Sequence, residues 1–390
     1  MHPELFTLPI IGYPIKTYGF CLMVGFLSAV WLAMRRAERV KASADTVLDL
    51  SFLALLFGVG GARVFYVAHY WQTQFAQRAN PWLAAINITE GGLEFIGGFI
   101  GASAAIVGYA VWKRIPLRLY LDILAPSTMW GLAIGRLGCF MNGCCFGGAC
   151  LAPGTVQAAY PWAVRFPYGS PAFWHEWEDR KVTVPAELIV SLSEELEPAL
   201  LPASALATSV EQRQGSIREL ADAAADYDRA KAEGVEPKEL AELQAGVDAA
   251  KKRVEAQQRT LATATLARAQ QFPSREVPTR RTSVSELQEL AAGYRSQFVH
   301  PTQLYAAINA LLICAVLSVL FHLRKRHGVV VGAMLIMYPI PRFLIEYIRA
   351  DNPHDVGGLT ISQFIVLGLL VIGGVYLYVL YKWLPERSLE

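Results

Sequence analysis

The stretch GRLGCFMNGCCFG, from Gly135 to Gly147, closes a long apolar run with an arginine and an asparagine. A charged side chain at the centre of a membrane helix costs about 2.5–3.5 kcal/mol on insertion scales, so a charge there needs a reason. The apolar run before this stretch indicates a membrane helix. Because a charge at its end needs a reason, Arg136 is a candidate site residue.

The overall composition is that of a membrane protein. Of 390 residues, 54% are apolar and 17% are charged, whereas soluble domains carry about 25% charged residues. A net charge of +2 gives no indication of nucleic-acid binding. The first fifteen residues lack the basic start and apolar core of a cleavable signal peptide, so we expect the first membrane helix to direct insertion.

Seven apolar segments are long enough, at about 20 residues each, to cross a bilayer as helices. They are residues 18–34, 48–70, 91–112, 119–140, 302–322, 329–348 and 359–383. Clusters of lysine and arginine follow the odd-numbered segments, as Arg35 and Arg36 follow the first. Because such clusters stay in the cytoplasm, we expect the N-terminus outside and the C-terminus in the cytoplasm.

The sequence thus predicts an all-α polytopic membrane protein with seven transmembrane helices, a small extracytoplasmic head and an inserted helical hairpin. Membrane helices one to four occupy residues 1–140, and helices five to seven occupy 299–390. Residues 141–200 form the head segment, with a short strand expected at 159–167. Residues 201–298 form the hairpin, because apolar residues keep a heptad spacing on both sides of a break at 233–237. These heptad positions are Val210, Ile217, Leu220, Ala224 and Tyr227, then Leu240, Leu243, Val247 and Val254.

A row of polar residues lies in the sixth segment. Tyr338, Arg342, Glu346 and Arg349 are spaced four, four and three residues apart, which stacks them on one helix face. The predicted orientation puts this face and Arg136 toward the outer leaflet at similar depth. Two arginines and a glutamate there should pair with one another or hold a ligand, although Arg349 alone could equally be an interfacial side chain.

Paired glycines open the third segment. Gly91 and Gly92 precede Ile96, and Gly97 and Gly98 follow it. Such glycines allow either close helix packing or a broken helix beside a wet pocket, and we favour the broken helix for these pairs.

The polar residues favour an anionic lipid headgroup as the ligand, since arginine binds phosphate bidentately where water is scarce. No His-Glu-x-x-His, Gly-x-Ser-x-Gly or phosphate-loop motif supports zinc protease, serine hydrolase or nucleotide chemistry. Cys139, Cys144, Cys145 and Cys150 could bind a metal or take part in catalysis, but disulfides or inert thiols are favoured on the outer side of a membrane. We expect no metal and no cofactor.

Five motifs resemble, in order, the signatures of the bacterial prolipoprotein diacylglyceryl transferases. They are GGL and GGxIG within 91–101, GRLGCFMNG at 135–143, PWAVxFP at 161–167, HPTQLY at 300–305 and RFxxEYxR at 342–349. They cover nearly the whole chain except about residues 170–298. The resemblance implies transfer of diacylglycerol from phosphatidylglycerol to the cysteine thiol of a prolipoprotein signal peptide, forming a thioether and releasing glycerol phosphate.

The resemblance also implies a place and partners. The protein would be a multi-pass protein of the bacterial inner membrane, with its active site toward the periplasm. Its partners would be phosphatidylglycerol, prolipoprotein signal peptides and membrane lipids, without nucleic acid.

The resemblance further implies roles for single residues. Arg136 would hold the phosphate, Arg342 would stabilise the phosphate or the thiolate, and Glu346 would orient Arg342. The catalytic candidates are Arg136, Arg342, Tyr18 and Glu346, and the substrate-binding candidates are Arg136, Asn142, Gly97, Gly98, Tyr338, Arg349 and His300.

Two positions depart from the family pattern. Ile96 stands where the family often has histidine or tyrosine, and Cys144 follows Gly143 where glutamate is typical. The thiol would then lose its proton to another base such as His300, or need no strong base beside two arginines. Two alternatives stay open: a related transferase with another acceptor or lipid, and a non-catalytic lipid-binding or redox protein using the cysteines.

Overall fold

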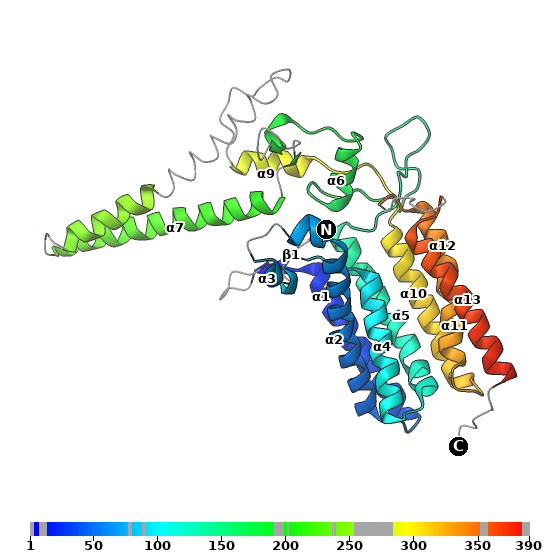
Figure 1. Ribbon diagram of the computed structural model, residues 1–390. Helices are drawn as coiled ribbons and strands as arrows, with labels where there is room; N and C mark the ends of the chain where they lie inside the picture. The colour runs from blue at the N-terminus through cyan, green and yellow to red at the C-terminus, as the bar shows by residue number, and fades with distance from the viewer. Residues whose placement is uncertain are drawn as a thin grey trace. The chain divides into compact units, whose positions relative to one another are not determined.

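The computed structural model describes residues 4–7, 14–76, 80–87, 91–190, 199–200, 203–235, 237, 239–252, 284–351 and 358–383. The chain is mostly helical and divides into two compact units. We call residues Asn142–Pro301 the head unit, and His2–Met141 with Thr302–Glu390 the span unit. Figure 1 shows the elements of both.

The span unit is built from long apolar helices. They are α1 (Thr17–Arg39), α2 (Ala44–His69), α4 (Phe95–Lys113), α5 (Leu117–Asn142), α10 (Thr302–Leu323), α11 (Val329–Met337), α12 (Pro339–Ile348) and α13 (Ile361–Lys382). Shorter elements are a π-helical turn at Trp71–Phe75, α3 (Pro81–Ile86), and strands β1 (Glu4–Thr7) and β2 (Pro14–Lys16), which pair antiparallel.

Six helices among the described residues are long and apolar enough to cross a membrane. They are α1, α2, α4, α10, the joined α11 and α12, and α13. The predicted segment 119–140 is also helical, as part of the 26-residue α5, but α5 is not among the six helices apolar enough to cross a membrane. Two of its polar residues, Asp122 and Ser127, are buried in the protein interior.

Buried polar contacts tie the helices to α5 near its start. The Asp122 carboxylate accepts from the backbone N–H groups of Gly328, Val330 and Val331 at 2.7–3.0 Å. It also lies 3.2 Å from Arg324 Nε. This carboxylate satisfies the N–H groups at the start of α11, which have no partner within the helix.

A second tie joins three helices. Arg36 near the end of α1 donates to Ser127 Oγ of α5 at 2.6 Å and to Ser318 Oγ of α10 at 3.0 Å. The apolar core packs around these contacts and includes Leu50, Ile123, Leu317, Phe321 and Val330.

Glycines bring α2 and α4 into backbone contact. A Cβ on Gly97 would lie 2.4 Å from the carbonyl oxygen of Gly61, and one on Gly101 would lie 2.3 Å from that of Phe57. α4 is regular from Phe95 onward. The broken helix predicted around Ile96 is therefore absent from the described residues of this segment, and the glycines there serve close packing. The non-helical stretch is residues 91–94, where Gly91 and Gly92 have φ of +82° and +78°.

The head unit has a small core of its own. It contains α6 (Pro171–Glu178), a 3-10 turn at Ala186–Leu188, strands β3 (Ile189–Val190) and β4 (Ala199–Leu200), α7 (Ala203–Glu233) and α9 (Val284–Gly293). Phe173, Leu188, Leu200, Leu287 and Ala291 are buried together in this core. The strand expected at 159–167 is reduced to isolated bridges, such as Val164 with Val299.

Two helical segments form the part predicted as a hairpin. After α7 the chain turns at Gly234, whose φ is +71°, and helical residues resume up to 252. Leu220, Ala224, Tyr227, Leu240, Leu243 and Val247 are all less exposed than most of their neighbours. The burial of Val210 and Ile217, and the position of Val254, lie outside the description. α9 also falls within 201–298, but it packs into the head core.

Candidate functional site

Arg136 and Arg342 lie near the same end of the span unit. The start of α11 contacts Asp122 of α5. Figure 1 shows that α5 and the joined α11–α12 run from there toward the same end of the bundle. Arg136 lies 14 residues beyond Asp122, and Arg342 lies 12 residues beyond Val330. At 1.5 Å per residue both arginines stand about 20 Å from the shared contact. The helices therefore carry both cations to similar depth.

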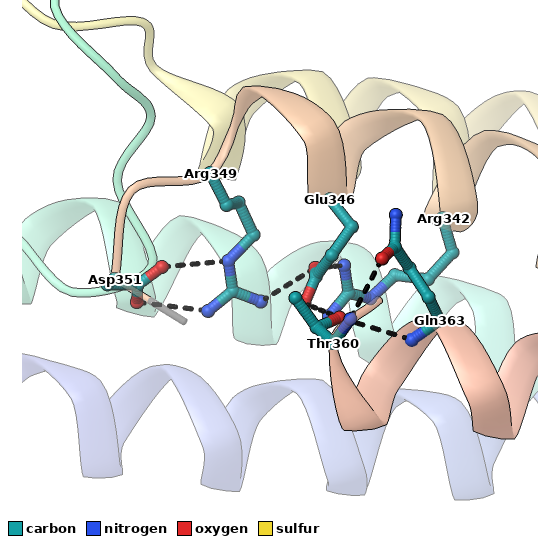
Figure 2. Close-up of polar contacts among 6 residues, drawn as sticks. All are labelled: Arg342, Glu346, Arg349, Asp351, Thr360 and Gln363. Atoms are coloured by element: carbon teal, nitrogen blue, oxygen red, sulfur yellow. Dashed lines mark hydrogen bonds and ion pairs between the residues drawn. The ribbon is translucent and has the colours of Figure 1, made fainter. Parts of the chain in front are cut away.

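Arg342 and Glu346 form a buried ion pair on α12 (Figure 2). The Arg342 guanidinium contacts Glu346 Oε2, and the two side chains are only 11% and 0% exposed. The spacing of four residues brings them together, because residues i and i+4 are neighbours on a helix. A buried charge is stable only when paired and hydrogen-bonded, so the pair is mutually dependent.

Arg349 is held by two carboxylates. Its Nε and Nη2 donate to the two oxygens of Asp351 at 2.9 Å each, and its Nη1 lies 3.6 Å from Glu346 Oε2. The bidentate contact fixes the guanidinium plane. Arg349 therefore already has a structural function, and its predicted role in substrate binding stays a prediction.

The other oxygen of Glu346 contacts the start of α13. Thr360, the N-cap of α13, donates its hydroxyl to Glu346 Oε1 at 2.9 Å. Thr360 and Gln363 also form a reciprocal capping box, in which each side chain accepts from the other's backbone N–H. Glu346, Thr360 and Gln363 are all at most 2% exposed.

The two tyrosine candidates lie on separate helices. Tyr18 is in the first turn of α1, where the close approach of Gly138 brings it beside α5, two residues beyond Arg136. A Cβ on Gly138 would lie 3.4 Å from the Tyr18 ring. Tyr338 joins α11 to α12 and is partly buried against the apolar core. Tyr18 thus belongs to the same end of the bundle as Arg136.

Gly97 and Gly98 serve the contact between α2 and α4, and their predicted part in substrate binding stays a prediction. The segment before them is fixed by Arg63 of α2, which is 8% exposed. Its guanidinium donates to five backbone carbonyl oxygens, those of Ala84, Ala85, Asn87, Gly91 and Gly92, at 2.7–2.9 Å. All five N–H groups of the arginine are satisfied in this way.

Asn142 and His300 belong to the head unit. Asn142 is the last residue of α5, and Gly143 ends the helix with φ of +77°, beside Phe166 and Ser170. His300 exchanges backbone hydrogen bonds with the 147–148 segment at 2.9 and 3.1 Å. Its ring lies 6.2 Å from that of Tyr160. Their predicted contacts with substrate stay predictions.

All six cysteines are recorded as thiols. Cys150 is buried in the head unit, where its backbone N–H donates to the carbonyl of Phe298 at 2.7 Å. Cys145 has a φ of +59°. The disulfide interpretation therefore has no support in the described residues, whereas the inert-thiol interpretation fits the burial of Cys150.

Sequence reasoning missed the roles of four residues that support the helices of the site, namely Thr360, Gln363, Asp122 and Arg63. Thr360 and Gln363 carried a readable signal, since a threonine followed three residues later by glutamine is the capping-box pattern. Asp122 carried one as well, because a lone carboxylate in an apolar run marks a buried contact. The hydrogen bonds from Arg63 to backbone carbonyl groups leave no signal in the sequence, since every backbone segment has carbonyl oxygens that can accept.

Comparison with known proteins assigns the family. The family model described as prolipoprotein diacylglyceryl transferase matches residues 3–379 of this chain. The chain belongs to this family. With six helices among its described residues able to cross a membrane, it is a multi-pass membrane protein.

Three relatives carry the name phosphatidylglycerol–prolipoprotein diacylglyceryl transferase. The protein from Rhodopirellula baltica is 39% identical over 161 residues, which cover 41% of this chain and 31% of the relative. That from Bacillus cytotoxicus is 41% identical over 130 residues, covering 33% and 47%. That from Photobacterium profundum is 36% identical over 159 residues, covering 40% and 56%. The matched stretches thus span from about a third to just over half of these relatives.

Proposed function

We propose that this protein transfers the diacylglyceryl group of phosphatidylglycerol to the lipobox cysteine of prolipoproteins. The thiol sulfur would attack the carbon of the diacylglycerol part that bears the phosphate. A carbon–sulfur bond forms, the carbon–oxygen bond to the phosphate breaks, and glycerol phosphate leaves with that oxygen. The thiol proton passes to a base or to the departing phosphate.

The observation that carries the proposal is the buried Arg342–Glu346 pair on α12. The departing phosphate develops negative charge, which fixed cations in a dry site stabilise strongly. Arg136 would hold the phosphate, since arginine matches its geometry with two parallel hydrogen bonds. Arg342, with its direction fixed by Glu346, would face the same phosphate or the attacking thiolate. Family membership supports this assignment.

The proposal includes a topology. Seven spans, with α5 as the fourth, would put the two termini on opposite sides of the membrane, with the N-terminus outside and the C-terminus in the cytoplasm. Basic residues at the ends of α1 and α4, such as Arg39 and Lys113, support this orientation. Tyr18 and Arg136 would then lie toward the periplasmic side of the bacterial inner membrane. There they would meet phosphatidylglycerol, other membrane lipids and the signal peptides of exported prolipoproteins.

The test is transfer in phosphatidylglycerol vesicles to a peptide with a lipobox cysteine, with products identified by mass spectrometry. We expect a thioether-linked diacylglyceryl peptide and free glycerol phosphate. Arg136→Gln should lower kcat/KM by about 100- to 1,000-fold, as the loss of a preorganised donor in a dry site does. The matched control is Arg35→Gln. Arg35 is an exposed arginine near the C-terminal end of α1 that stacks on Trp31.

Three results would oppose the proposal. Full activity of Arg136→Gln would remove this residue from the mechanism. Transfer of another lipid group, or to another thiol, would indicate a related transferase instead. A protein that binds lipid without forming product would indicate a non-catalytic function.

A further inference from the structure

The buried network around Glu346 continues past α12 into the first turn of α13 (Figure 2). The Thr360 hydroxyl lies 2.9 Å from Glu346 Oε1 and 3.2 Å from the backbone nitrogen of Gln363. A backbone N–H can only donate, so the hydroxyl accepts from Gln363 and gives its single proton to Glu346. The result is a directed chain of hydrogen bonds from the α13 backbone to the carboxylate.

The two oxygens of Glu346 serve different partners. Oε1 accepts from Thr360, whereas Oε2 contacts Arg342 and lies 3.6 Å from Arg349 Nη1. The last torsion of a glutamate side chain is broad, so its carboxylate plane is set by hydrogen bonds rather than by a rotamer well. Glu346 is 1% exposed. Water therefore has little access to replace the donor on Oε1.

We propose that Thr360 is a positioning residue for the transfer reaction, which fixes the direction of the Arg342 guanidinium through Glu346. This rests on the proposed function, in which Arg342 faces the reacting phosphate or thiolate. Removing the Thr360 hydroxyl takes the hydrogen bond of 2.9 Å away from Oε1, so the carboxylate turns and takes Arg342 with it. A displacement of about 1 Å at a reacting centre can cost about 100-fold in rate.

Gln363 supports the same arrangement. Its side-chain oxygen accepts from the Thr360 backbone N–H at 2.9 Å, which holds the N-cap residue in place. The start of α13 is thus fixed by two reciprocal bonds while it supports Glu346. Asp351 anchors the other neighbour of Glu346, because it holds Arg349 bidentately.

A purely structural alternative is that Thr360 only caps α13. The chain offers a matched control in Ser43, the N-cap of α2, whose hydroxyl accepts from the Thr46 backbone N–H at 3.2 Å. Ser43→Ala removes a cap of the same kind at an exposed position. It therefore measures what loss of a cap does to the reaction.

The experiment uses the full chain in phosphatidylglycerol vesicles and compares Thr360→Val, Thr360→Ser and Ser43→Ala. Valine keeps the shape of threonine without the hydroxyl, and serine keeps the hydroxyl. We expect Thr360→Val to lower kcat by about 10- to 100-fold with KM within about threefold, because the effect is on the transition state. Thr360→Ser should stay within about threefold of the wild type, and Ser43→Ala should leave kcat unchanged.

A double-mutant cycle separates positioning from capping. In a Glu346→Gln background Thr360→Val should lower kcat little further, because the contact between residue 346 and Arg342, through which Thr360 acts, is already changed. Independent, multiplicative losses would overturn the inference, as would a fully active Thr360→Val or an equal loss in Ser43→Ala. A wild-type protein without transfer activity would instead overturn the proposed function together with this inference.

Discussion

Glu346 accepts from side chains on two helices, and this makes the direction of Arg342 sensitive to single atoms. The network contains two guanidinium groups and two carboxylates, from Arg342, Arg349, Glu346 and Asp351. Their formal charges cancel, which lowers the cost of burying them. Among these four residues, Arg349 is held bidentately by Asp351. The direction of the Arg342 guanidinium depends instead on Glu346.

This difference predicts unequal effects of two lysine substitutions. Arg342→Lys keeps the charge but loses the planar donor set, and we expect kcat to fall by about 100-fold or more. Arg349→Lys should cost less, about tenfold, because Asp351 and Glu346 still surround the ammonium group. Steady-state transfer kinetics in vesicles, with circular dichroism of each purified variant, make the comparison. Equal losses would mean that Arg349 also meets the substrate.

At the residue scale the sequence predicted the helix face of Arg342, Glu346 and Arg349. It did not predict the contact from the next helix that supports Glu346. The spacing of Arg342, Glu346 and Arg349 was sufficient, since helix geometry alone brings such residues together, and their contacts confirm the shared face. Thr360 follows from no periodicity, because it lies on the next helix. Only the capping-box pattern marked it as special, and that pattern does not say which carboxylate a hydroxyl meets.

Glu176 in the head unit gives a pH dependence. Burial raises the pKa of its carboxyl, although the Gln297 backbone N–H, 2.7 Å away, and Lys181 act in the opposite direction. The folded head therefore binds this proton more tightly than the unfolded chain. The contribution of Glu176 to the stability of the head is full below the ordinary pKa of 4.5 and is lost as pH rises through the raised folded pKa.

Glu176→Gln should remove this loss and make the head more stable at neutral pH. Hydrogen exchange of the segment from 164 to 190, corrected for intrinsic rates across pH 4 to 8, measures it. Asp179→Asn is the control, because Asp179 is exposed and the hydrogen bond that it accepts from Lys181 lowers its pKa instead. Unchanged protection from hydrogen exchange in Glu176→Gln would show that the buried carboxylate does not lower the stability of the head.

At the scale of elements, the pairing of α2 and α4 shows what a sequence leaves undecided. Paired glycines are equally suited to an unwound helix and to a close helix contact, because both need the absence of a side chain. The choice depends on the partner surface. Here α2 presents Gly58 and Gly61 to Gly98 and Gly97, so the backbones meet.

Adding a methyl group at this contact should separate the two helices. Gly97→Ala would bring its Cβ to 2.3 Å from Phe65 Cβ and 2.4 Å from the Gly61 oxygen, neither of which can move away cheaply. We expect a loss of about 1–3 kcal/mol in stability. Gly108→Ala on the same helix meets nothing within 4 Å, so it should be neutral or stabilising by up to about 1 kcal/mol.

Thermal unfolding in detergent, followed by circular dichroism, would compare the two glycine variants under the same conditions. A Gly97→Ala protein as stable as Gly108→Ala would show that α2 and α4 can separate without loss. Activity of Gly97→Ala in the transfer assay then shows whether the contact also supports the site.

At the scale of the whole molecule, part of the predicted insertion at 201–298 packs into the head core. Helical periodicity identifies a helix but not what it packs against. α9 lies within the predicted hairpin, yet Leu287 and Ala291 are buried with Phe173 and Leu188 in the head core. Leu200 of β4, just before α7, is buried there too. We therefore take residues 203–283 as the removable insertion.

Two deletions distinguish these boundaries. Replacing residues 203–283 by a short Gly/Ser linker keeps Leu200 and α9, so the head should stay folded and transfer activity should persist within about threefold. Deleting 200–295 removes Leu200, Leu287 and Ala291, and each lost core leucine costs about 2–5 kcal/mol. That head should open, which hydrogen exchange of α6 and the β3 segment detects. If the shorter deletion abolishes transfer while α6 stays protected, the hairpin itself takes part in the reaction, for instance by holding the prolipoprotein.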